Sequence, residues 1–109
     1  MPLKPLVFEI LLALVDEPRH GWGLVADIEK RLGGEPILPG NFYRTLRRLL
    51  AEGLIVEARR PGGARGSGSE ERRRYFALTD RGRRLAKAEA RRLEALVNDR
   101  RTRRLLKVR

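Results

Sequence analysis

The order of apolar and polar residues divides the chain into a helical part, a short strand-forming part and a final helical part. Before Gly53, apolar side chains recur with helical spacing in three segments, and after it they run over two segments of strand length. A last helical pattern continues towards the C-terminus. We therefore expect a mainly α fold of the α+β class, with three short helices, a two-stranded hairpin and a long last helix.

The first helical segment, residues 6–15, is apolar on nearly every side apart from Glu9. Pro5 suits the first turn of such a helix. A helix with so little polar surface needs to be buried on more than one side, and a small domain rarely surrounds a helix completely. We therefore predict that Leu6 and Ile10 contribute to an interface with a second copy of the chain.

A second helix is predicted over residues 21–32, and a third runs from Pro39 to Gly53. The third helix separates into a stripe rich in arginine and an apolar stripe made of Phe42, Leu46, Leu49 and Leu50. Guanidinium groups bind phosphate oxygens and the guanine edge in bidentate fashion, and an Asn side chain suits adenine, although an ordinary solvated face is the alternative. Three short helices of which the last is basic predict a helix-turn-helix. The candidate DNA-contacting residues on the third helix are Gly40, Asn41, Tyr43, Arg44, Arg47 and Arg48.

Two strands are predicted at residues 54–59 and 73–78, joined by the sequence PGGARGSGSEE. Arginines flank this hairpin on both sides, so it forms a positively charged wing beside the helices. Arg65 at its tip is a candidate for contact with the minor groove or with phosphate, and a solvated loop charge is the alternative. Residues 1–78 are thus predicted to form a winged helix-turn-helix that binds DNA.

Thr79 is predicted to cap a last helix of roughly 19 residues, about 28 Å long. A three-helix core that the wing already closes leaves no face for the apolar stripe of this helix, so we expect a second protomer to cover it. The stripe consists of Leu85, Ala86, Ala90, Leu93, Leu96 and Val97. Residues 79–109 are therefore predicted to form a dimerisation helix and a basic tail within one compact domain. The tail from residue 99 either extends the helix or frays.

The chain carries 25 basic and 14 acidic residues, for a net charge of +11. Residues 1–53 hold seven of each kind, whereas residues 79–109 hold twelve basic and four acidic. Such asymmetry predicts a polyanionic partner, double-stranded DNA first and an anionic membrane second. The basic last helix lacks Trp, Tyr and Phe, which disfavours a membrane surface. No segment approaches the ~20 apolar residues of a membrane span, and the absence of Cys fits a reducing compartment, so we expect a cytoplasmic protein.

Residues suited to catalysis or metal binding do not cluster in the sequence. His20 is the only histidine, and neither a cysteine nor a carboxylate cluster accompanies it, so we expect no metal, no cofactor and no enzymatic activity. We expect His20 to position the turn before the second helix. One alternative stays open, a basic winged-helix module that binds RNA or a protein partner without a transcriptional role. Single-stranded RNA favours exposed aromatic platforms, which Tyr75 and Phe76 alone do not provide.

Five motifs, in order along the chain, resemble the PadR family of transcriptional regulators in its short form with a single C-terminal helix. They are the opening PLVFEILLAL; HGWGL at residues 20–24, similar to H-G-Y-G-[IL]; PGNFYRTL at 39–46, similar to P-G-T-L-Y-R-x-L; GLI at 53–55; and RRYFALT at 73–79 with Gly82 and Arg83, similar to R-R-Y-Y-x-L-T-x-x-G-R. Asn41 stands where the family usually has Thr or Ser, and Trp22 replaces Tyr.

The resemblance implies a winged helix-turn-helix homodimer that binds pseudo-palindromic operators, usually as a repressor, with the last helix serving dimerisation. It also implies release by a signal, commonly a small aromatic or hydrophobic effector near the dimer interface. No aromatic residue follows Phe76, so Phe8 and Trp22 are the nearest aromatic candidates for such a ligand site.

Overall fold

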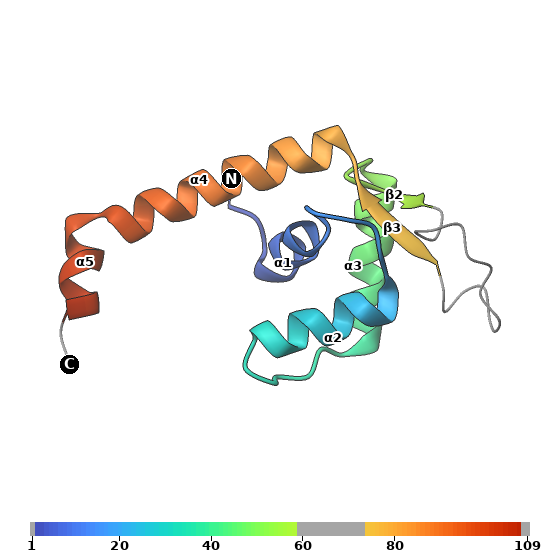
Figure 1. The fold of residues 1–109 in the computed structure, drawn as a ribbon, viewed down its shortest axis with the longest axis horizontal. Helices are drawn as coiled ribbons and strands as arrows, with labels where there is room; N and C mark the ends of the chain where they lie inside the picture. Colours follow the sequence, from blue (N-terminus) through green and yellow to red (C-terminus); the bar gives the residue numbers. More distant parts are fainter. Residues whose placement is uncertain (1, 59–73, 108–109) are drawn as a thin grey trace.

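The computed structural model describes residues 2–58 and 74–107. Its elements, in chain order, are α1 (Pro5–Ala13), β1 (Arg19–His20), α2 (Gly21–Arg31), α3 (Pro39–Ala51), β2 (Ile55–Ala58), β3 (Tyr75–Leu78), α4 (Asp80–Asn98) and α5 (Arg100–Lys107). Figure 1 shows α1, α2 and α3 bundled beside α4, with the strands at one end of the bundle and α5 at the far end of α4. This is the winged helix-turn-helix that the sequence predicts.

One hydrophobic core joins the three helices, the sheet and the first half of α4. Phe42, Leu46 and Leu49 enter it from α3, at the spacing predicted for the inner face of that helix. Among residues 2–58 and 74–107, the buried apolar residues are Ile10, Leu11, Leu14, Leu24, Ile28, Phe42, Leu46, Leu49, Leu54, Ile55, Phe76 and Ala86. Burial of these side chains is the main stabilising contribution to the fold.

Two residues assigned from the sequence to the dimer interface lie instead in the core of the single chain. Ile10 and Ala86 are 0% and 6% exposed, respectively. The reason is that α4 packs across α1, which also contacts α2 and α3. The chain itself therefore covers more of α1 than the sequence suggested, and the assignment of these two residues is corrected.

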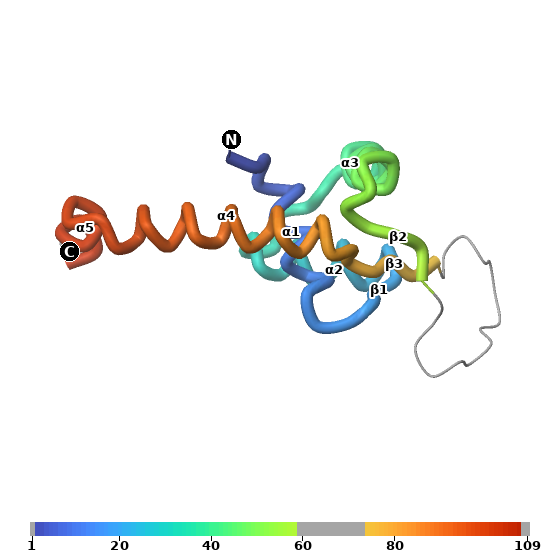
Figure 2. The backbone as a smooth tube through the Cα atoms, turned by 90° about the horizontal axis from the view of Figure 1, so that it is seen from above, coloured from blue at the N-terminus to red at the C-terminus, as the bar shows by residue number. Residues whose placement is uncertain are grey.

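The sheet has three antiparallel strands in the order β1-β3-β2, one more than the predicted hairpin. β2 pairs with β3 as expected, and β1 adds two residues on the other side, with Arg19 opposite Phe76 and His20 opposite Tyr75. A two-residue strand carries no periodicity, so the sequence pattern could not reveal it. Figure 2 shows the three strands side by side, at the opposite end of the molecule from α5.

The start of α4 is fixed by Thr79, as predicted. Its Oγ1 accepts a hydrogen bond from the Gly82 N–H (3.0 Å) and donates one to the Gly53 carbonyl oxygen (2.7 Å). At Gly82 the helix passes directly over Leu54. A Cβ at this position would run into the Leu54 carbonyl oxygen and would lie 2.9 Å from Cδ1 of Leu78. Glycine is therefore required here for close packing, although it weakens the helix itself.

We expect Gly82→Ala to lower the free energy of unfolding by about 2 kcal/mol, because the added methyl group overpacks a backbone contact. Helix propensity alone would favour Ala by about 1 kcal/mol. Gly40→Ala is the matched control, since no atom lies within 4 Å of a Cβ at that helical glycine. Urea denaturation of both variants measures the difference. Equal stability of the two variants would contradict the packing explanation.

The basic tail forms a separate helix rather than extending α4 or fraying. The backbone of Asp99 is extended (φ −61°, ψ 140°) and ends α4. The Asp99 carboxylate accepts the backbone N–H of Arg101 at 2.8 Å and so caps α5. The Arg101 guanidinium and the backbone N–H groups of Arg101 and Thr102 keep the pKa of Asp99 below its ordinary value. No helix within residues 2–58 and 74–107 has both the length and the apolar composition to cross a membrane.

Candidate nucleic-acid interface

The outer face of α3 presents all six residues that the sequence assigned to DNA contact on this helix. The inner face of α3 packs into the hydrophobic core, so the opposite face of the helix is exposed to solvent. The exposed residues are Gly40, Asn41, Tyr43, Arg44, Arg47 and Arg48. Pro39 is the first residue of α3, no side chain caps the helix, and its first turn contains no acidic residue. The positive end of the helix dipole is therefore available to an anion.

The polar side chains of this face differ in how firmly they are held. Arg48 makes an ion pair with Glu52, one turn further along, at 3.3 Å between Nε and Oε1. Thr45 donates its hydroxyl to the Asn41 carbonyl oxygen at 2.8 Å, which turns it back onto its own helix. Within the described part of the chain, Arg44 and Arg47 have no carboxylate within ion-pair distance. Their charges are thus available to a partner.

Tyr43 lies between the core and the solvent. Its ring meets Phe42 edge to face, with 5.3 Å between the ring centroids and 84° between the planes. It is 39% exposed, and its hydroxyl lies beside Gly21 at the start of α2. The ring is therefore held by packing on one side while part of the side chain stays exposed to solvent.

A hollow of about 470 Å³ borders α3 on the side of the N-terminal segment. Its walls are Lys4, Pro5, Leu6 and Val7 on one side and Asn41, Arg44, Thr45 and Arg48 on the other. Lys4 adds a cation that the sequence analysis missed, because Lys4 and α3 are far apart in the chain.

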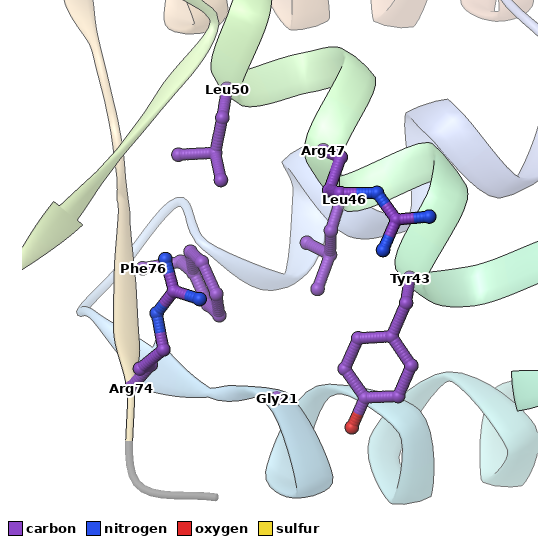
Figure 3. A pocket seen from close by; sticks show the side chains of 7 residues that line it. All are labelled: Gly21, Tyr43, Leu46, Arg47, Leu50, Arg74 and Phe76. Carbon is purple, nitrogen blue, oxygen red and sulfur yellow. The ribbon is translucent and has the colours of Figure 1, made fainter. Parts of the chain in front are cut away.

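A second hollow, of about 210 Å³, borders α3 on the side of the sheet. It is lined by Gly21, Tyr43, Leu46, Arg47, Leu50, Arg74 and Phe76 (Figure 3). Arg74, immediately before β3, is the arginine of the wing that the structure describes. Arg65, predicted at the wing tip, lies outside the described residues.

Glu89 of α4 is a buried carboxylate, with 5% of the residue exposed. Both carboxylate oxygens of Glu89 accept hydrogen bonds from Arg92, each at 2.8 Å. These bonds, and a smaller contribution from the backbone of Leu3, hold the pKa of Glu89 below its ordinary value despite burial. Glu89 therefore stays ionised within the fold, paired with Arg92 one turn further along α4.

His20 caps α2, in agreement with its expected role in positioning that turn. Its Nδ1 accepts the Gly23 N–H at 3.0 Å, and its ring meets Tyr75 edge to face. Across residues 2–58 and 74–107, no three His, Cys, Asp or Glu side chains lie close enough to hold a metal ion. Of the two aromatic residues considered for an effector, Trp22 is 54% exposed and Phe8 is half-buried. Neither lines the two hollows beside α3.

The second half of α4 extends beyond the helical bundle (Figure 1). Leu96 and Val97 at its end are 52% and 49% exposed, and Leu105 and Leu106 of α5 are 73% and 68% exposed. Of the other residues assigned to the dimer interface, Leu6, Leu85 and Leu93 are half-buried and Ala90 is exposed. Exposed large apolar side chains on a projecting helix are typical of surfaces that mediate protein–protein contacts.

Residues 10–88 match the family model described as the transcriptional regulator PadR-like family. A relative is an uncharacterized 37.1 kDa protein in transposon TN4556 of Streptomyces fradiae, which is 40% identical over 81 residues. The alignment takes in 74% of this chain but 21% of that protein, so this chain spans about one fifth of the relative's length.

Solved structures share the fold. A PadR-like transcriptional regulator from Bacillus cereus has a TM-score of 0.73 at 22% identity, with 95% of this chain and 93% of that chain covered. Bacillus subtilis PadR, crystallised in complex with operator DNA, has a TM-score of 0.62 at 21% identity, with 80% and 47% covered.

Proposed function

This chain belongs to the PadR-like family of transcriptional regulators, and on that premise we propose that it binds double-stranded operator DNA as a homodimer and represses transcription. The observation that carries the proposal is the solvent face of α3. This face presents Asn41, Arg44 and Arg47 side by side, and the helix contains no acidic residue. Arginine and asparagine on the exposed face of a helix suit the donor and acceptor pattern of the major groove.

The residues of this face divide into base-reading and backbone-binding groups. Asn41 and Arg44 lie near the N-terminus of α3, the part of a recognition helix that reaches base edges. Tyr43, Lys4 and the arginines on either side of the helix suit phosphate contacts, which set orientation and affinity. Arg65 at the wing tip is proposed as a further contact to the minor groove or to phosphate.

Dimerisation is proposed through the projecting half of α4. Leu96 and Val97 are exposed in the single chain. The other proposed interface residues are Leu85, Ala90 and Leu93 of α4 and Leu6 of α1, which packs against α4. We expect the dimer to present its two α3 helices about 34 Å apart, because that is one turn of B-DNA. The operator would then be a pseudo-palindrome with one half-site for each protomer.

Repression follows from occupancy, because a dimer bound across a promoter blocks access by polymerase. The complex of Bacillus subtilis PadR with operator DNA supports this use of the shared fold. Release by an effector is part of the proposal, with Phe8 and Trp22 as the aromatic residues to examine. Titration of effector candidates against Trp22 fluorescence tests that part.

Selection from a pool of random duplexes with the purified protein tests the function. We expect enrichment of a pseudo-palindrome whose half-sites are about 10 base pairs apart. Recovery of single-stranded RNA in preference to any duplex, or no enrichment over random competitor, would overturn the proposal. The RNA outcome would favour the alternative of a winged-helix module without a transcriptional role.

We expect operator affinity to fall steeply with salt, because the arginines release counterions from the phosphates. About six phosphate contacts per dimer predict a loss of about a thousandfold between roughly 50 and 200 mM salt. Fluorescence anisotropy at a series of salt concentrations measures the slope. An affinity independent of salt would mean that phosphate contacts do not contribute to binding.

A further inference from the structure

The hollow between α3 and β3 combines an apolar floor with a cationic rim. Figure 3 shows Leu46, Leu50 and Phe76 pointing into it, with the guanidinium groups of Arg47 and Arg74 on opposite sides. Its volume is about 210 Å³. The hydroxyl of Tyr43 lies close by, beside Gly21. Such a hollow suits a ligand with an anionic group and a small apolar body.

The position of the hollow identifies that ligand. It lies along the sheet side of α3 and shares Tyr43 and Arg47 with the face proposed to enter the major groove. When a helix occupies the major groove, the backbones of the two strands run along its two sides. The C–H groups of a deoxyribose match the apolar floor of the hollow. The single negative charge of the adjoining phosphodiester matches its cationic rim.

We propose that this hollow binds one sugar-phosphate unit of the operator backbone, with Arg47 and Arg74 contacting the same phosphodiester. The inference rests on the proposed function and extends it by naming Arg74 and the ligand. Arg74 immediately precedes β3 and Arg47 belongs to α3, so the shared phosphate joins the wing to the recognition helix. Guanidinium groups are well suited to such phosphate contacts.

Glu57 modulates this site by competing with the phosphate. It lies on β2, opposite Phe76 in the sheet register, and its carboxylate makes an ion pair with Arg74. Arg74 also lies over the Phe76 ring, 6.0 Å from its centroid. The side chains of Glu57 and Arg74 are each 49% exposed, so the pair can open towards solvent. The carboxylate therefore holds Arg74 at the rim and partly neutralises its charge.

Four variants test the site by the affinity for the selected operator and for a random duplex. We expect Arg74→Ala to weaken both affinities by about tenfold. The slope of log affinity against log salt concentration should fall by about one. Glu57→Gln should raise both affinities several-fold. The variant that combines Glu57→Gln with Arg74→Ala should have the same affinities as Arg74→Ala. Lys30→Ala is the control: it removes one charge from α2 at a position about 13 Å along the helix from Gly21, which lines the hollow. It should have no comparable effect. A tightening by Glu57→Gln that persists without Arg74, or an equal effect of Lys30→Ala, would overturn the proposal.

Operators with a single methylphosphonate at each backbone position distinguish the backbone phosphate from a free anion. We expect one position in each half-site to weaken binding by the wild-type protein more than binding by Arg74→Ala, in which Arg47 alone still contacts that phosphate. If no position behaves in this way, the hollow does not hold the backbone. Failure of the wild-type protein to select any duplex would instead refute the proposed function, so the two failures are distinguishable.

Discussion

Leu96→Asp is expected to convert the protein to a monomer and to lower operator affinity at least a hundredfold. Leu96 is 52% exposed in the single chain, so a carboxylate there costs little in the folded monomer. At the proposed interface the same carboxylate would be buried without a partner, which costs several kcal/mol. Each protomer would then bind its half-site alone and lose the effective concentration that the dimer provides.

Sedimentation equilibrium and operator titration on the same sample measure both effects. Leu32→Asp is the control, because Leu32 is also exposed (41%) but lies at the end of α2, away from α4. We expect the control to remain dimeric and to retain most of its operator affinity. If Leu96→Asp also remains dimeric, the end of α4 is not the interface.

Arg44→Ala is expected to relax sequence discrimination by about 1 to 3 kcal/mol at one base pair in each half-site. Arg44 is exposed in the first half of α3 and has no ion pair within the described residues, so its fork is available to a guanine edge. Arg48→Ala is the comparison on the same face: because Arg48 is already paired with Glu52, we expect it to lower affinity for all operators to a similar degree without changing the base preference. Titration against a panel of operators, each with one substituted base pair, measures the change. Unchanged preferences in Arg44→Ala would exclude base readout by this side chain.

The features that the sequence predicted are those that local periodicity determines. The stripe of Phe42, Leu46 and Leu49 was sufficient to place the inner face of α3, and the same spacing placed its arginines outside. The cap at Thr79 was predictable because its partner, the Gly82 N–H, lies three residues further on.

The features that the sequence missed depend on contacts between distant segments. Lys4 and Arg74 reach the two sides of α3 from segments more than twenty residues away, and β1 forms only because β3 returns beside it. Ile10 was assigned to an interface because periodicity cannot show which side of an apolar helix its own chain covers. The sequence motif includes Gly82 without showing why glycine is needed there, and the contact with Leu54 in the structure supplies the reason.

The presence of α3 in the major groove is tested most directly by methylation of guanine N7 in the bound operator, because this atom lies in that groove. We expect the dimer to protect guanines in two patches about 10 base pairs apart, and Arg44→Ala to lose protection at one guanine in each patch. Full methylation of guanines under saturating protein, or protection confined to minor-groove positions, would contradict the proposed docking of α3.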